Sequence, residues 1–228
     1  GSTDGLDWSN IAAETVVVQV AGSETLDARG GVLGAVQFDV PDGALLRLDA
    51  VSLGGVSVSG DGNVIVELSA GEADASLRSL SLVENGGTKP ALTVRLQESL
   101  VFSGDLGAEQ PLVEVPDGLA LTTGANQLDG LSVTGDGAVL ASLAGGAAST
   151  DLSGVAVSGT KTLSVSGVLD FSGDLGEFDV EVAEAGLLRL TGSIVDGASI
   201  SGDGAVEITL PSDPAADPDL SNFAPEAG

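Results

Sequence analysis

Ser59-Gly60-Asp61-Gly62 returns as Thr134-Gly135-Asp136-Gly137 and again as Ser201-Gly202-Asp203-Gly204. Glycine tolerates a positive φ, and an aspartate side chain accepts hydrogen bonds from its own local backbone. This anchor therefore predicts the same tight turn at three places in the chain.

The repetition extends well beyond the anchor. A shift of 75 residues lays residues 41–82 on 116–157 without a gap, and a shift of 67 lays 117–143 on 184–210. Repetition of this kind is typical of stacked architectures, in which each unit buries its apolar face against its neighbours. We therefore expect a structural or adhesive protein rather than an enzyme.

The segments after each anchor alternate between apolar and polar residues. They read Val64-Ile-Val-Glu-Leu68, Val139-Leu-Ala-Ser-Leu143 and Val206-Glu-Ile-Thr-Leu210. The first, third and fifth columns stay apolar while the columns between them vary. This period of two is the signature of a β-strand with one inward and one outward face.

One full copy reads as about seven short strands. In the second copy we expect them near residues 91–96, 100–103, 112–115, 119–123, 131–134, 138–143 and 152–157. The first copy begins near Thr15 and the third near Thr160. Helix signals are weak, because Gly interrupts every apolar run; Glu24–Gly30 fits a helical turn and Ser9–Glu14 a short N-terminal cap.

Two all-β architectures accommodate these strands: a single β-solenoid (β-helix) and a string of tandem β-sandwich domains. We favour the solenoid, with about 2.7 copies of a roughly 70-residue unit and about three coils per copy. A solenoid can stop at any coil, and small residues suit a narrow interior. Only Phe102 and Phe171 recur as large aromatic residues, from a second anchor, Phe-Ser-Gly-Asp-Leu-Gly.

Three segments follow from this pattern: residues 1–14 as an expression scar and cap, 15–210 as the repeat domain, and 211–228 as an acidic, Pro-rich linker or tail. The opening Gly-Ser and the lack of a signal peptide suggest an excised piece of a longer protein.

The charge balance excludes whole classes of partner. The 228 residues carry 34 acidic and only seven scattered basic side chains, a formal charge of −27. No basic footprint for nucleic acid exists, and no apolar run approaches the roughly 20 residues of a membrane helix. The expected partners are neighbouring repeats of the parent chain or further copies of this chain, because coil ends expose unpaired strand edges.

Catalytic and metal chemistry find little support. The chain lacks His and Cys, the usual general base and the usual zinc ligands. Calcium is the cofactor left to consider, since Ca²⁺ takes carboxylate and carbonyl oxygens. The candidates are Asp61, Asp136 and Asp203, although a plain β-turn is the favoured interpretation because each turn carries a single acid.

The other acids that match between copies also read as turn residues. They are Asp42 with Asp117, and Asp105 with Asp174. A catalytic residue is normally unique, whereas these recur, so we expect no catalytic residues and no enzyme. Arg47 and Arg189, both in Leu-Leu-Arg-Leu, are expected to face outward with partly buried stems beside a neighbouring acid.

One stretch resembles a known kind of repeat. Leu128-Asp-Gly-Leu-Ser-Val-Thr-Gly-Asp-Gly-Ala-Val139, followed by Asp151-Leu-Ser-Gly-Val155, is similar to the repeats of large bacterial β-strand-repeat surface proteins. The resemblance implies an extracellular or cell-surface location and an adhesin-like or surface-layer-like role as stalk, lattice element or scaffold. The alternatives are a β-helix polysaccharide-active enzyme and a carbohydrate-binding module.

Overall fold

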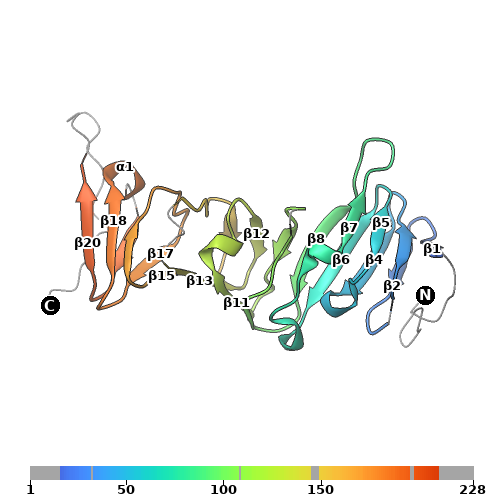
Figure 1. Ribbon diagram of the computed structural model, residues 1–228, viewed down its shortest axis with the longest axis horizontal. Coiled ribbons are helices and arrows are strands. Elements are labelled where there is room, and N and C mark those ends of the chain that lie inside the picture. The colour runs from blue at the N-terminus through green and yellow to red at the C-terminus, as the bar shows by residue number, and fades with distance from the viewer. Residues whose placement is uncertain (1–15, 32, 108, 145–148, 196–197, 211–228) are drawn as a thin grey trace. The chain divides into compact units, whose positions relative to one another are not determined.

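The computed structural model describes residues 16–31, 33–107, 109–144, 149–195 and 198–210 (Figure 1). Within this range the fold is all-β, and the pairs between its named strands run parallel. Parallel strands stacked coil upon coil form a β-solenoid, so the predicted fold class is confirmed over tandem sandwiches, whose sheets are antiparallel.

The chain divides into two compact units, residues 1–114 and 115–228. The strands of the first unit are β1 (Val16–Gln19), β2 (Thr25–Asp27), β3 (Val36–Asp39), β4 (Leu45–Asp49), β5 (Ser57–Ser59), β6 (Asn63–Leu68), β7 (Ser81–Val83), β8 (Ala91–Leu96), β9 (Leu100–Phe102) and β10 (Leu112–Glu114). Odd-numbered strands pair in the order β1-β3-β5-β7 and even-numbered strands in the order β2-β4-β6-β8-β10. Two strands therefore complete one coil.

The second unit repeats this alternation. Its strands are β11 (Ala120–Gly124), β12 (Ser132–Gly135), β13 (Ala138–Leu143), β14 (Val155–Val157), β15 (Lys161–Val165), β16 (Val168–Asp170), β17 (Asp179–Val182), β18 (Leu187–Thr191), β19 (Ser199–Ser201) and β20 (Ala205–Thr209). Odd-numbered strands form one ladder, β11-β13-β15-β17-β19. Even-numbered strands form two, β12-β14 and β16-β18-β20.

The core lies where the sequence predicted it, along the inward columns of the strands. Val64, Val66 and Val139 are fully buried, and Ala141 is 3% exposed. Burying a Val or Leu side chain contributes roughly 1.5–3 kcal/mol. Ser142, in an outward column, is exposed, so the predicted assignment of faces is confirmed.

All seven strands predicted for the second copy are present as β8 to β14. The first copy is β1 to β7 and the third is β15 to β20. The expected three coils per copy are an underestimate, because seven strands at two per coil make three and a half. Matched strands of neighbouring copies therefore belong to different ladders of a coil: β13 lies in an odd-numbered ladder and its counterpart β20 in an even-numbered one.

A four-residue turn that the sequence pattern did not predict recurs along the chain. The N–H of its fourth residue donates to the carbonyl of its first, at 3.0–3.4 Å. Among the described residues it occurs at Leu53–Val56, Leu77–Leu80, Leu128–Leu131, Leu152–Val155 and Leu175–Phe178. The strand expected at 152–157 therefore begins only at Val155, because residues 152–154 form this turn.

Helical segments also differ from expectation. Glu24–Gly30 contains a strand, β2, rather than a helical turn. Short helices occur inside the repeated block, at the edges of coils: the 3₁₀ turns η1 (Ala50–Ser52), η2 (Ala70–Glu72), η3 (Leu77–Ser79) and η4 (Ala125–Gln127), and α1 (Gly192–Val195). None of these described helices is long enough to span a membrane. The predicted cap at Ser9–Glu14 and the segments 1–14 and 211–228 lie outside the described residues.

Candidate functional site

The three Gly-Asp-Gly turns are held against the backbone of the preceding coil. Gly60, Gly135 and Gly202 have φ of +106°, +117° and +109°. A Cβ on these residues would lie 2.2–2.3 Å from the carbonyl oxygens of the preceding coil, those of Val40, Val115 and Val182. Both the backbone conformation and the contact therefore require Gly.

The aspartate inside the turn reaches the next coil. Asp136 Oδ1 accepts a hydrogen bond from Ser158 Oγ at 2.5 Å, and Asp61 accepts one from Thr88 Oγ1. In these two copies the recurring acid is thus part of a contact between coils, which is a structural role.

Within the second unit the structure does not bring the calcium candidates together. Asp136 and Asp203 lie there on turns next to β13 and β19. Three strand spacings separate β13 from β19, or roughly 14 Å at about 4.8 Å each. Among the described residues, no group of three or more acidic side chains is placed to hold a metal ion. The plain β-turn stays the favoured prediction for these acids, with calcium binding as the alternative to be tested.

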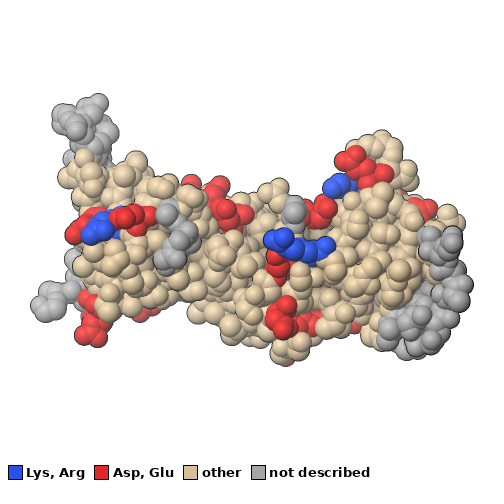
Figure 2. Space-filling model, in the orientation of Figure 1, with Lys and Arg blue, Asp and Glu red and all other residues tan. Residues whose placement is uncertain are grey.

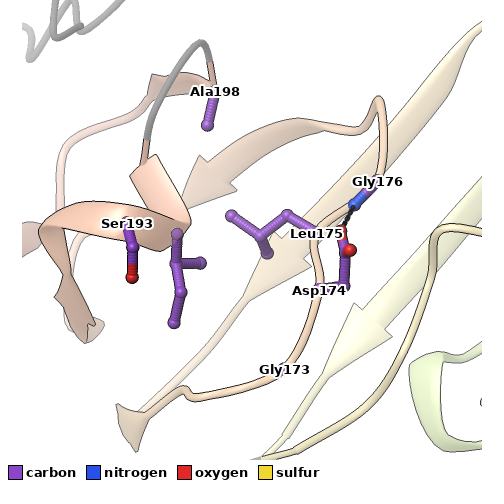
Figure 3. Close-up of a pocket in the computed structure, with 7 residues that line it drawn as sticks. Gly173, Asp174, Leu175, Gly176, Ser193 and Ala198 are labelled. Carbon is purple, nitrogen blue, oxygen red and sulfur yellow. Dashed lines mark hydrogen bonds between the residues drawn. The ribbon is translucent and has the colours of Figure 1, made fainter. Parts of the chain in front are cut away.

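The second anchor also forms a turn that is closed by its own acid. Asp105 Oδ1 accepts from Gly107 N at 2.7 Å, and Asp174 Oδ1 accepts from Gly176 N at 2.8 Å (Figure 3). The Gly107 N–H, followed by the Arg78 guanidinium, holds the pKa of Asp105 below its usual value. The turn interpretation of this pair is confirmed.

Asp42 and Asp117 lie exposed in matched Pro-Asp-Gly turns. In each turn a backbone N–H returns to the proline carbonyl, from Ala44 N to Pro41 O at 3.0 Å and from Leu119 N to Pro116 O at 3.1 Å. This pair is likewise confirmed as turn residues.

A buried carboxylate, which the sequence analysis missed, organises the outward face of the first unit. The Glu67 side chain is only 4% exposed and accepts from Arg29 Nη1 at 2.5 Å and from the Arg47 guanidinium. Arg29 also pairs with Asp27, and this hydrogen bond lowers the pKa of Asp27. The sequence contained a signal for this ion pair. Glu67 lies in an outward column, next to the outward column that holds Arg47 on the neighbouring strand.

Glu72 is a second buried acid, and a pattern in the sequence identifies it. Its carboxylate accepts from Ser69 N at 2.7 Å, Ser69 Oγ at 2.9 Å and Val51 N at 3.1 Å. Ser69-Ala-Gly-Glu72 is a capping box, in which a Ser and a Glu three residues later satisfy the first N–H groups of a helix. Glu72 therefore stabilises η2 and ties it to η1.

Arg189 repeats the arrangement of Arg47 in the second unit. Its guanidinium contacts Asp170 Oδ1 at 3.4 Å and Glu207 Oε2 at 2.6 Å, on the strands to either side. These two carboxylates raise the pKa of Arg189. The expectation that Arg47 and Arg189 face outward beside neighbouring acids is confirmed.

The basic side chains as a group are engaged in ion pairs. All seven in the sequence lie within 4 Å of a carboxylate: Arg29, Arg47, Arg78, Lys89, Arg95, Lys161 and Arg189. On the face shown in Figure 2, the basic groups lie beside acidic ones. None of these seven cations is therefore an uncompensated charge for an anionic ligand.

Two shallow hollows occupy matched places in the repeat. One, of about 230 Å³, lies between the second anchor and α1 and is lined by residues including Gly173, Leu175 and Ser193 (Figure 3). The other, of about 420 Å³, lies between the segment after β2 and η1 and is lined by residues including Gly31 and Ser52. Their recurrence marks them as a product of coil stacking.

Comparison with protein-family models, curated proteins and solved structures found no match to this chain. The resemblance to bacterial surface repeats is thus an inference from the quoted motifs alone.

Proposed function

We propose that this chain is a structural element of an extracellular bacterial repeat protein, serving as a stalk, a surface-lattice element or a scaffold for a binding tip. The observation that carries the proposal is that the recurring polar residues bond to other parts of the same chain. Asp61, Asp136, Asp105 and Asp174 hold turns or join coils, and Arg189 joins three strands.

The charge arrangement supports the same role. The sequence has 34 acidic and seven basic side chains, and all seven basic ones are paired. The net charge of −27 therefore comes from the excess of surface acids. Such a surface favours solubility of a repeat protein and disfavours polyanionic partners. It supplies no recognition element for nucleic acid.

A carbohydrate-binding module finds less support. Such modules bind sugar rings on exposed aromatic faces. Four of the five Phe residues are described, and all four are buried: Phe38, Phe102, Phe171 and Phe178. Trp8 and Phe223 lie outside the described residues.

A polysaccharide-active enzyme also finds less support. The hollow beside Asp174 is the nearest approach to an active site, but that carboxylate already accepts the Gly176 N–H. A glycosidase needs two carboxyl groups facing one bond. The residues lining this hollow include a single acid, Asp174.

A direct test separates structure from catalysis. The chain is incubated with a panel of neutral and acidic polysaccharides, and new reducing ends or unsaturated products are measured. We expect none from the wild type. In parallel, the chain is placed between a membrane anchor and an epitope on a bacterial surface, where we expect the epitope to become accessible to antibody-coated beads.

The matched control for both assays is Asp174→Asn, which keeps an oxygen for the Gly176 N–H. Depolymerisation by the wild type that disappears in Asp174→Asn would replace the structural proposal with an enzymatic one. An epitope no more accessible than one on the anchor alone would also contradict it.

A further inference from the structure

The sixth strand of the third copy, β20, presents a half-covered edge. It is the terminal strand of the ladder β16-β18-β20 among the described residues. Its inward residues Val206 and Ile208 are only partly buried, and Leu210 beside them is 56% exposed. The same columns at Val64, Val66 and Leu68 of β6 are 0–1% exposed. The difference is apolar surface that a further strand would cover.

Inside the chain, the strand that covers this edge has a fixed identity. The first strand of each copy pairs in parallel with the sixth strand of the copy before it. In the first unit β8 lies on β6, with Val64 opposite Leu92 and Val66 opposite Val94. In the second unit β15 lies on β13, with Ala141 opposite Leu163 and Leu143 opposite Val165.

β1 is itself a first strand. Val16-Val-Val-Gln-Val20 aligns with Leu92-Thr-Val-Arg-Leu96 of β8, with apolar residues in the same three columns. One edge of β1 pairs with β3, and no described strand pairs with the other. Val17, in its outward column, is 55% exposed.

We propose that β20 of one copy of this chain binds β1 of a second copy in the register that β6 uses for β8. Val206 then lies opposite Val16, Ile208 opposite Val18 and Leu210 opposite Val20. This is strand addition at a sheet edge, in which main-chain hydrogen bonds give affinity and alternate side chains set the register. The inference does not depend on the proposed function.

The outward columns are compatible with this register despite the acidic surface. Glu207 would lie opposite Val17, and Thr209 opposite Gln19, so no carboxylate faces another. Glu207 is already paired with Arg189 on its own ladder. The net charge of −27 opposes association at long range. Added salt screens this repulsion, because the Debye length falls from about 10 Å at 0.1 M to about 3 Å at 1 M. Association should therefore become stronger as the salt concentration rises.

The contact is heterologous, since β1 and β20 are different surfaces. A bound pair keeps one free β1 and one free β20, and association continues beyond the dimer. An isologous dimer has no such remaining edge. This distinction makes the proposal testable by the pairing of single-site variants.

The absence of Cys from the sequence makes thiol cross-linking selective. Gln19→Cys and Thr209→Cys are made as separate variants, one carrying a size tag, and are mixed at about 0.5 M NaCl under mild oxidation. Residues opposite each other on paired strands lie about 4.8 Å apart, within the range a disulfide spans. We expect cross-links between the two variants and at most a trace within either variant alone.

Ser142→Cys is the matched control, because it places an exposed thiol on the outward face of β13, away from both edges. It should not cross-link with Gln19→Cys. Equal cross-linking in every mixture, or none between Gln19→Cys and Thr209→Cys, would overturn the proposal.

A second measurement needs no cross-link. Val17 is exposed, so Val17→Glu and Val17→Arg should both fold. Opposite Glu207, the first adds a like charge and the second an opposite charge, each worth about 0.2–1 kcal/mol. Sedimentation should show the dissociation constant rising about two- to five-fold in Val17→Glu and falling in Val17→Arg. Identical constants, or a wild type that stays monomeric at every concentration and salt, would contradict the register.

Discussion

The outward face of the ladder β2-β4-β6-β8-β10 differs sharply from that of β11-β13-β15-β17-β19. The first carries ion-paired charges from Arg47, Glu67, Arg95 and Glu114. The second carries mostly hydroxyl groups and some acids, in rows that run Thr122, Leu140, Thr162, Asp179, Ser199 and Gly124, Ser142, Ser164, Glu181, Ser201.

Both faces are built on the same frame. In both ladders, inward columns of Val, Leu and Ala alternate with the outward columns. The same glycine turns lead into β6 and β13. The comparison shows that turns and inward columns specify the coil, whereas outward columns vary without changing it. Substitutions that affect the frame should therefore cost far more than those that exchange one face for the other.

The largest effect is expected from a charge placed in an inward column. Val139→Asp puts a carboxylate where the native side chain is fully buried, and an unpaired charge there should abolish cooperative unfolding in urea. Ser142→Asp, three residues later on the outward face, should shift the midpoint little. Similar small shifts in both variants would mean that the two faces are wrongly assigned.

The next largest effect should come from a turn glycine. Gly60→Ala places a Cβ 2.2 Å from Val40 O at φ +106°, and we expect a loss of about 2–4 kcal/mol in unfolding free energy. Gly118 is the matched control: its φ is +74°, but nothing lies within 4 Å of the added Cβ. Gly118→Ala should cost about 1–2 kcal/mol, the backbone penalty alone. Equal costs would indicate that contact between coils is not what requires Gly60.

The charged face itself should be sensitive at one residue. Glu67→Ala removes the shared partner of Arg29 and Arg47, and Arg29 keeps Asp27. Because both arginines are partly exposed, we expect a loss of about 1–3 kcal/mol. Glu207→Ala removes an exposed partner of Arg189 in the second unit, and its effect on the urea midpoint should be small. If both substitutions are equally mild, the buried cluster does not distinguish the two units.

A smaller, pH-dependent difference should separate two acids of the first unit. The Arg29 hydrogen bond lowers the pKa of Asp27, so its contribution to stability is present above the unfolded value of 3.8 and is lost as pH falls through the native one. Burial raises the pKa of Asp49, so its ionisation destabilises the fold as pH rises from 3.8 through its native value. Asp27→Asn should lower the melting temperature at pH 7, and Asp49→Asn should raise it.

Both effects should shrink as pH falls, and each should vanish below the native pKa of its own group, where the aspartate and the asparagine are both neutral. Melting curves at pH 2, 4 and 7 provide the measurement. A stabilising Asp27→Asn at pH 7 would contradict the role of the Arg29 contact.

The smallest effect is expected from calcium. With one acid per turn, Ca²⁺ and Mg²⁺ should raise the melting temperature equally and modestly by screening, and Asp136→Ala should change little. A true site would favour Ca²⁺ and add roughly 2.7 kcal/mol at a hundred-fold excess over its dissociation constant. A Ca²⁺-selective rise that Asp136→Ala removes would show that the turn is a metal site.

Much of the fold follows from the sequence because its determinants are local. Alternation in Val64–Leu68 and Val139–Leu143 predicts β6 and β13, and the Gly-Asp-Gly anchors predict the turns before them. The partners of the turn acids could not be predicted, since Asp136 meets Ser158 only when one coil is stacked on the next. Burial of Glu67 likewise depends on two arginines from other coils, Arg29 in the turn after β2 and Arg47 in β4.

The odd number of strands in each copy has a consequence for how such a gene can change. Because two strands complete a coil, gain or loss of one seven-strand copy moves every later motif to the opposite ladder, as β13 and β20 already show. Gain or loss of two copies restores the original side. Where function requires a motif to stay on one side of the solenoid, the protein should therefore gain or lose copies in pairs. Where the side does not matter, single copies can be gained or lost.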